Sequence, residues 1–290
     1  MLVDFGTYTC INWIRTLPYL RAWVASYRPH GVAAVTVHTP EFSIEHDVEL
    51  VRRATREMRL DHPIAIDNEF SVWTAFGNHY WPALYIADPG GRIQHHQFGE
   101  GGYEQSERVI RHLLVDAGAT ALPDEAAAHE GTGIEAPADW DHLSSPETYL
   151  GLDRSSGFAS PGGGVRDVAH DYTVPTLLHP DEWALAGTWT LTDERAVANE
   201  PNGHIAFQFR ARDLNLILAP PAGGTVRFRV WLDGTSPDES HGIDVDAMGE
   251  GVVDHARLYQ LIRQPGPIED RRFEIELTEP GASAFCFTFG

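Results

Sequence analysis

The chain has 290 residues, 42% of them hydrophobic, which is enough for two ordinary domains with packed cores. With 42 acidic residues against 21 basic ones, the formal net charge is -21, and such a surface repels phosphate backbones, so nucleic acid is not an expected partner. No apolar run approaches the roughly 18 residues of a membrane span, and no signal peptide is evident. The sequence as given therefore predicts a soluble protein of unknown location, cytoplasmic as written or extracytoplasmic if a leader precedes Met1.

The first 116 residues alternate between strand and helix patterns. Strands are expected at 2–5, 32–37, 62–66, 83–87 and 92–96, and helices at 10–27, 44–60, 68–76 and 104–116. The last two strands are expected to form a hairpin across the turn residues 88–91. Strands that alternate with helices imply an α/β sheet covered by helices on both faces.

The composition changes at residue 117. Residues 117–165 are rich in Ala, Pro, Gly, Ser and acidic side chains, which is typical of a linker. From 166 to 290, short segments of alternating polarity separated by turn residues predict a β-sandwich or jelly roll. Strands are expected there at 205–209, 214–218, 226–230, 273–277 and 284–289. The sequence thus predicts an α/β domain over 1–116, a linker over 117–165 and an all-β domain over 166–290.

The strongest candidate for a functional residue is Cys10, in the segment FGTYTCINWIRTLP at 5–18. A strand is expected to lead there directly into a helix whose first turn carries the thiol. Unpaired N–H groups and the helix dipole favour an anion at a helix start, which lowers the pKa of a cysteine below its free value of about 8.5. Arg15 adds positive charge nearby. On these residues alone, a buried structural cysteine remains the alternative.

This segment resembles the active site of the TlpA- and DipZ-like thioredoxin (redoxin) family, whose members have an aromatic residue and Trp-Thr-Tyr-Thr-Cys-Ile-Asn here, followed by Cys or Trp. The resemblance continues at VHTPEFS (37–43), YWPALY (80–85), HHQFGEG (95–101), FRARDL (209–214), LYQLIR (258–263) and FTFG (287–290). It covers nearly the whole chain. It implies a thioredoxin fold followed by a jelly roll like the carbohydrate-binding modules of the DipZ group.

Two positions depart from the family pattern. Position 6 is glycine where the family usually has tryptophan, which leaves room beside the thiol. Position 13 is Trp13 where dithiol members have the resolving cysteine, the thiol that releases a mixed disulfide by internal attack. The chemistry of Cys10 is therefore expected to be monothiol, to borrow an external thiol, or to be lost. Trp13 is also expected to shield Cys10 and to restrict which substrates approach it.

Further candidate site residues come from the resemblance and from individual positions in the chain. Pro82 matches the cis-proline that faces the reactive cysteine in thioredoxin folds, and Trp81 before it is expected to contact the substrate; without the resemblance, Pro82 would be a proline at a strand start. Thr7 stands at the Thr-x-x-Cys spacing of peroxiredoxins, where a threonine and an arginine hold the peroxide. Glu41 follows a core strand and is expected either to relay a proton for Cys10 or to act as a helix N-terminal acid.

No cofactor and no metal are expected. His95 and His96 are neighbours on a predicted strand, so they point to opposite faces and do not chelate together. Cys286 lies in a predicted strand and is expected to be structural, with no disulfide to Cys10. Four aromatic residues of the β domain are candidates for stacking on sugar rings, although aromatic residues of a β-sandwich more often lie in its core. They are Trp183, Trp189, Trp231 and Tyr259.

Three functions remain open. The leading hypothesis is a thiol-dependent oxidoreductase of the antioxidant type, in which Cys10 attacks a disulfide or reduces a peroxide and an external thiol completes the cycle. Its partners would be thiol or disulfide client proteins, small thiols, peroxide and, at the β domain, a glycan. The second hypothesis is a non-catalytic client- or glycan-binding module, and the third a degenerate scaffold in which Trp13 fills the former site. Retention of both Cys10 and Pro82 favours the first over the third.

Overall fold

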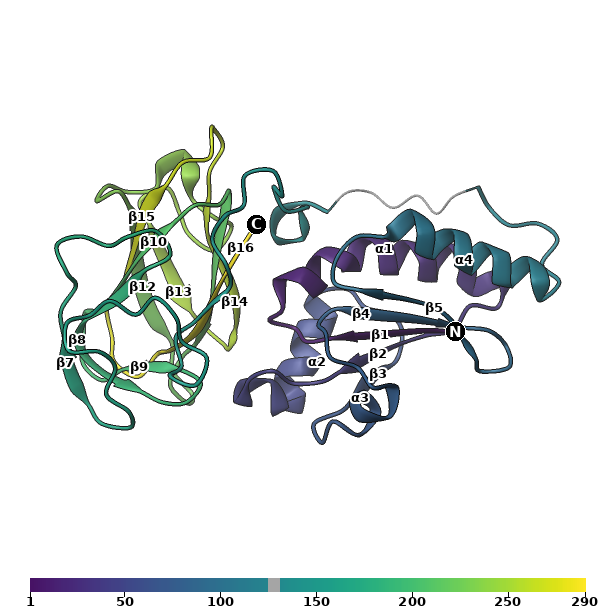
Figure 1. The fold of residues 1–290 in the computed structure, drawn as a ribbon, viewed down its shortest axis with the longest axis horizontal. Helices are drawn as coiled ribbons and strands as arrows, with labels where there is room; N and C mark the ends of the chain where they lie inside the picture. The colour runs from purple at the N-terminus through teal and green to yellow at the C-terminus, as the bar shows by residue number, and fades with distance from the viewer. Residues whose placement is uncertain (125–130) are drawn as a thin grey trace. The chain divides into compact units, whose positions relative to one another are not determined.

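The computed structural model describes residues 1–124 and 131–290, and the chain divides into two compact units, Met1–Pro137 and Ala138–Gly290 (Figure 1). The first unit is built on a five-stranded sheet in the order β3-β2-β1-β4-β5. Its strands are β1 (Leu2–Gly6), β2 (Ala34–His38), β3 (Ile64–Ile66), β4 (Ala83–Ala87) and β5 (Ile93–Phe98). Its helices are α1 (Ile11–Tyr27), α2 (Val48–Glu57), α3 (Ser71–Phe76) and α4 (Tyr103–Asp116), with short 3-10 turns η1 (Arg28–His30), η2 (Ser43–His46) and η3 (Gly133–Glu135).

Strand β1 lies at the centre of this sheet, parallel to β2 and antiparallel to β4. Helices α1 and α4 cover one face, and α2 and α3 cover the other (Figure 1). The α/β sheet covered on both faces, predicted from the alternation of strands and helices, is confirmed. The central strand enters α1 after four residues, which places residues 7–10 at one end of the sheet.

The helix predicted over 44–60 is two separate elements, η2 and α2. Asp47 interrupts it because its backbone is extended and its side chain caps α2, accepting hydrogen bonds from the N–H groups of Glu49 at 2.8 Å and Leu50 at 3.4 Å. Within η2, Glu45 is fully buried. This single turn carries a residue that contributes to the candidate site.

The second unit is all β, as predicted. Its strands are β6 (Thr148–Tyr149), β7 (His170–Tyr172), β8 (Trp183–Leu191), β9 (Ala196–Ala198), β10 (Gly203–Phe209), β11 (Asp213–Ala219), β12 (Val226–Leu232), β13 (Glu250–Val253), β14 (Arg257–Arg263), β15 (Arg271–Leu277) and β16 (Ser283–Phe289), with a 3-10 turn η4 (Asp238–Ser240). The long strand β8 pairs with β10 in one antiparallel sheet and with β7 and β9 in the other. One large core lies between the two sheets of this sandwich.

Most of the aromatic residues considered for sugar stacking belong to that core. Trp183, Trp189 and Tyr259 have no exposed surface, so they are not available to a sugar ring. Trp231 alone of these four is partly exposed, and its ring stacks on His204 with centroids 6.1 Å apart. Cys286 is fully buried in β16, where its thiol donates to the carbonyl of Phe287 at 3.3 Å.

Residues 117–165, the predicted linker, include the boundary between the two units and also strand β6, which pairs with β16. The N–H of Leu150 donates to the carbonyl of Phe285 at 2.8 Å. Because backbone bonded into a sheet resists proteases, we expect limited proteolysis to cut first between 117 and 147 and to leave two stable fragments. First cuts within 166–290 would contradict this prediction. Residues 125–130 of this range lie outside the described residues.

Candidate functional site

The site is built on the elbow, residues 7–10, between β1 and α1. The N–H of Cys10 donates to the carbonyl of Thr7 at 3.1 Å, which closes the turn, and the carbonyl of Cys10 accepts the first helical hydrogen bond, from Ile14 at 3.0 Å. Cys10 is the N-cap residue of α1, with extended backbone. Its half-buried thiol therefore lies where the unpaired N–H groups of the first helical turn favour an anion.

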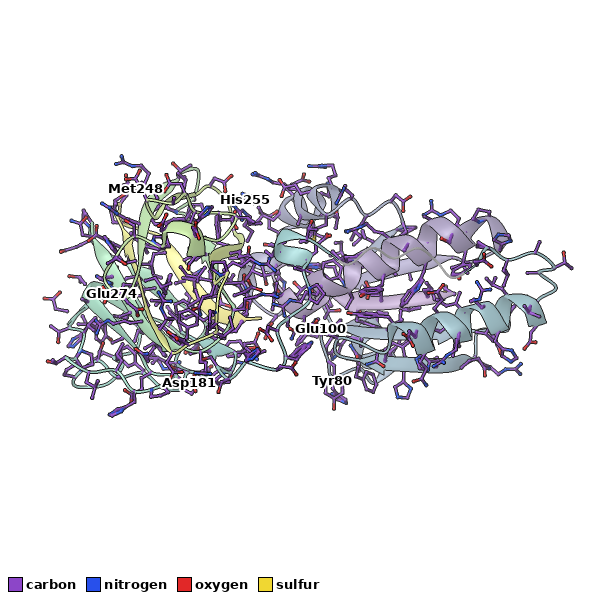
Figure 2. All side chains as sticks on the ribbon, turned by 90° about the horizontal axis from the view of Figure 1, so that it is seen from above. Tyr80, Glu100, Asp181, Met248, His255 and Glu274 are labelled. Carbon is purple, nitrogen blue, oxygen red and sulfur yellow. The ribbon has the colours of Figure 1, made fainter. Side chains whose placement is uncertain are left out.

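The segment before β4, which contains Trp81 and Pro82, lies next to the Cys10 thiol although it is 71 residues away in the sequence. The sulfur of Cys10 lies 3.9 Å from the carbonyl oxygen of Trp81, and the peptide bond between Trp81 and Pro82 is cis. The indole of Trp81 donates to the carbonyl of Thr39 at 3.0 Å and packs on Trp73, with ring centroids 4.3 Å apart. Tyr80, labelled in Figure 2, is more than half exposed next to this segment. The structure thus brings Cys10 together with Trp81 and Pro82.

Trp13 lies inside the unit, with 1% of its surface exposed. Its indole N–H donates to the carboxylate of Asp4 at 2.8 Å. A Cβ atom on Gly6 would come within 2.2 Å of the indole. The indole of Trp13 therefore fills the space that Gly6 leaves. Trp13 was expected to shield Cys10 from approaching substrates, but its side chain packs against β1 instead.

Asp4 is a buried carboxylate of β1 that is not among the predicted site residues. It accepts hydrogen bonds from the indole of Trp13 and, at 3.0 Å, from the hydroxyl of Thr36 on the neighbouring strand. Burial raises the pKa of Asp4 to about 6, although both hydrogen bonds favour the ionised form. The available signal was one acidic residue within the apolar strand LVDFG.

Thr7 and Arg15 are engaged with other side chains. The Thr7 hydroxyl lies 3.2 Å from Nε2 of His38, a buried residue of β2 whose pKa burial lowers to about 4. The guanidinium of Arg15 pairs with the carboxylate of Glu100 at 3.3 Å, and both side chains are less than a tenth exposed. Figure 2 labels Glu100 on the first unit.

The carboxylate bonded to the elbow belongs to Glu45 rather than to Glu41. Glu45 is fully buried and accepts hydrogen bonds from the hydroxyl of Thr9 and from the backbone N–H groups of Glu41 and Phe42, the latter at 3.0 Å. Burial raises the pKa of Glu45 to about 7. Glu41 itself is half-buried in the loop after β2. The N–H of Phe42 donates to the acid three residues later, but a phenylalanine side chain cannot complete a capping box, so the sequence held no clear signal for Glu45.

The histidines considered as metal ligands face different neighbours. Nε2 of His95 lies 3.3 Å from the hydroxyl of Ser106, whereas the ring of His96 packs on Phe98. Within residues 1–124 and 131–290, no three His, Cys, Asp or Glu side chains are grouped in a way that would hold a metal ion. The helices in this part of the chain are also too short or too polar to cross a bilayer.

Comparison with known proteins identifies the family. A family model described as "Thioredoxin like C-terminal domain" matches residues 145–290, half of the chain. The chain belongs to this thioredoxin-like family, as the resemblance of the elbow and the other motifs indicated. Protein DipZ of Mycobacterium tuberculosis is 33% identical over 237 residues, which are 81% of this chain and 32% of DipZ.

Two shorter proteins also match part of the chain. The thiol-disulfide oxidoreductase YkuV of Bacillus subtilis is 25% identical over 115 residues, which are 40% of this chain and 77% of YkuV. The crystal structure of StoA from Bacillus subtilis aligns over 36% of this chain and 77% of StoA, with 19% identity and a TM-score of 0.32. The chain spans about a third of the length of DipZ.

Proposed function

We propose that the protein is a monothiol thiol-disulfide oxidoreductase that acts through Cys10. The observation that carries this proposal is the position of the thiol, partly exposed at the start of α1 and 3.9 Å from the carbonyl of Trp81. The family membership and the match to YkuV support the same chemistry. The buried Trp13 at the resolving position makes an external thiol necessary.

The reaction has two exchange steps. The Cys10 thiolate attacks one sulfur of a client disulfide, forming a mixed disulfide, and the other client sulfur leaves as a thiolate that takes up a proton. A small external thiol then loses its proton and attacks the mixed disulfide at the client-derived sulfur. The Cys10 thiolate leaves, and the external sulfur is joined to that client-derived sulfur in a disulfide. In this reading Trp81 and Pro82 line the place where the client backbone lies beside Cys10.

A peroxidase is the less favoured function. In the Thr-x-x-Cys arrangement the threonine hydroxyl and an arginine hold the peroxide, but here the Thr7 hydroxyl faces His38 and the Arg15 guanidinium pairs with Glu100. Both groups would have to exchange these partners before they could bind a peroxide. A disulfide client needs only the exposed side of Cys10 and the backbone next to it.

Turnover of a glutathionylated peptide, with glutathione as the reducing thiol, tests the proposal. We expect Cys10→Ser to lower the rate at least 100-fold because the nucleophile is lost. The matched control Cys286→Ala removes the other, fully buried thiol and should keep the rate within about twofold. Equal rates for wild type and Cys10→Ser would overturn the proposal. Binding of the peptide without turnover would favour the non-catalytic module.

A further inference from the structure

A buried carboxylate that the two exchange steps do not use lies directly behind the elbow. Glu45 has no exposed surface, and its hydrogen-bond donors are hydroxyl and backbone N–H groups, so within the described residues its charge is not balanced by a cation. One of these hydroxyls belongs to Thr9, which immediately precedes Cys10 and is also fully buried. The carboxylate is thus bonded to the residue that directly precedes the reacting thiol in the chain.

Thr7, two residues before Thr9 in the elbow, is another polar neighbour of this carboxylate and favours its ionised form. The hydroxyl of Thr7 lies 3.2 Å from Nε2 of His38. Between the two threonines, the ring of Tyr8 stacks on His38 with centroids 5.7 Å apart, and its hydroxyl donates to the carbonyl of Ile44 at 3.3 Å. Three consecutive residues before Cys10 are therefore fixed to β2 and η2.

We propose that Glu45 is a positioning residue for Cys10, which holds the elbow through Thr9 and whose negative charge disfavours the neighbouring thiolate. The inference rests on the proposed function only in taking Cys10 as the reacting thiol. Like charges that share a poorly solvated site raise the cost of ionising the second group. Because burial brings the pKa of Glu45 to about 7, its charge changes in the range where thiols also begin to ionise.

The other titratable groups around the elbow are less suited to this role. Burial keeps His38 on β2 neutral at this pH, since its pKa is lowered to about 4. His46 and Asp47, next to Glu45 in the chain, are exposed and therefore screened by water. The remaining groups are Tyr8 in the elbow, the half-buried Glu41, Asp4 bound to the indole of Trp13, and the Arg15–Glu100 pair.

The test is the pH dependence of Cys10 alkylation by iodoacetamide in the full chain, with the labelled residue assigned by peptide mass spectrometry. We expect Glu45→Gln to move the midpoint of the rate profile to lower pH, by on the order of one unit. The matched control Glu49→Gln removes a carboxylate that is 75% exposed and should leave the midpoint unchanged. An unchanged midpoint in Glu45→Gln, or an equal shift in Glu49→Gln, would overturn the proposal.

A second pair of variants covers the case in which Glu45→Gln does not fold. Thr9→Ser keeps the hydroxyl bonded to Glu45 and should reproduce the wild-type profile, whereas Thr9→Val removes it, disfavours the charged carboxylate and should lower the midpoint. Identical profiles for the two Thr9 variants would also overturn the proposal. Alkylation does not require a disulfide client, so a protein with these profiles but no turnover would contradict the proposed function and leave this inference standing.

Discussion

The reduced Trp13→Cys variant is expected to lose about 3 kcal/mol of unfolding free energy and, on oxidation, to form a disulfide with Cys10. The loss follows from removing a side chain that is 1% exposed and that donates to the buried Asp4. The disulfide with Cys10 is expected because residue 13 lies in the first turn of α1, three residues after Cys10, and residues three apart on a helix are neighbours. Disulfide-reductase activity with a dithiol reductant should rise, since an internal thiol then resolves the mixed disulfide.

A redox titration with intact mass spectrometry and urea unfolding would measure both effects. Gly6→Ala supplies the matched control, because its added Cβ would come within 2.2 Å of the Trp13 indole in the parent chain. The alanine should be clearly destabilising beside Trp13 and nearly neutral beside the introduced cysteine, so the two changes are not additive. A variant that folds but cannot bridge Cys10 to the new thiol would show that the elbow lacks the geometry of a dithiol site.

Between pH 3.5 and pH 7, the parent chain is expected to lose about 3 kcal/mol of unfolding free energy relative to the Asp4→Asn variant. Burial raises the pKa of Asp4 from 3.8 to about 6, so the folded state binds more protons than the unfolded state between these values. The stability that the folded chain gains by keeping Asp4 protonated is fully present below pH 3.8 and is lost as the pH rises through 6. Asparagine carries no charge and does not suffer this loss.

Urea unfolding at several pH values measures this difference. Glu45 and His38, whose pKa values are also shifted by burial, contribute equally to both proteins, so the difference isolates Asp4. Asp61→Asn is the matched control because that carboxylate is 68% exposed and pairs only at the surface with Arg28. A difference that stays constant with pH would mean that Asp4 titrates normally in the folded chain.

The elbow could be predicted because its signal is local. A strand pattern that runs into a helix pattern places Cys10 at a helix start whatever the rest of the fold is. The buried polar groups around it could not be predicted in the same way, because long-range pairing creates them. Asp4 meets Thr36 only because β1 and β2 pair in parallel register, and Glu45 meets Thr9 across 36 residues of chain.

In the all-β unit, too, features with a local sequence signal could be predicted and features created by long-range pairing could not. Strands with alternating polarity, such as β12 and β15, were predicted near their observed bounds, whereas β8 was missed. Its sequence WALAGTWTL lacks a clear alternation and contains Gly187 with a positive φ of 87°, a conformation that favours glycine. The strand exists because it pairs with neighbours in both sheets, which no short window of sequence reveals.

The central claim is that Cys10 alone exchanges with disulfides, and trapping its mixed disulfide tests it most directly. The native protein would be incubated with glutathione disulfide without reductant, and the adduct located by intact and peptide mass spectrometry. We predict one glutathione on Cys10, none on the fully buried Cys286, and removal of the adduct by excess glutathione. No adduct on Cys10, or a disulfide between Cys10 and Cys286, would contradict the monothiol account.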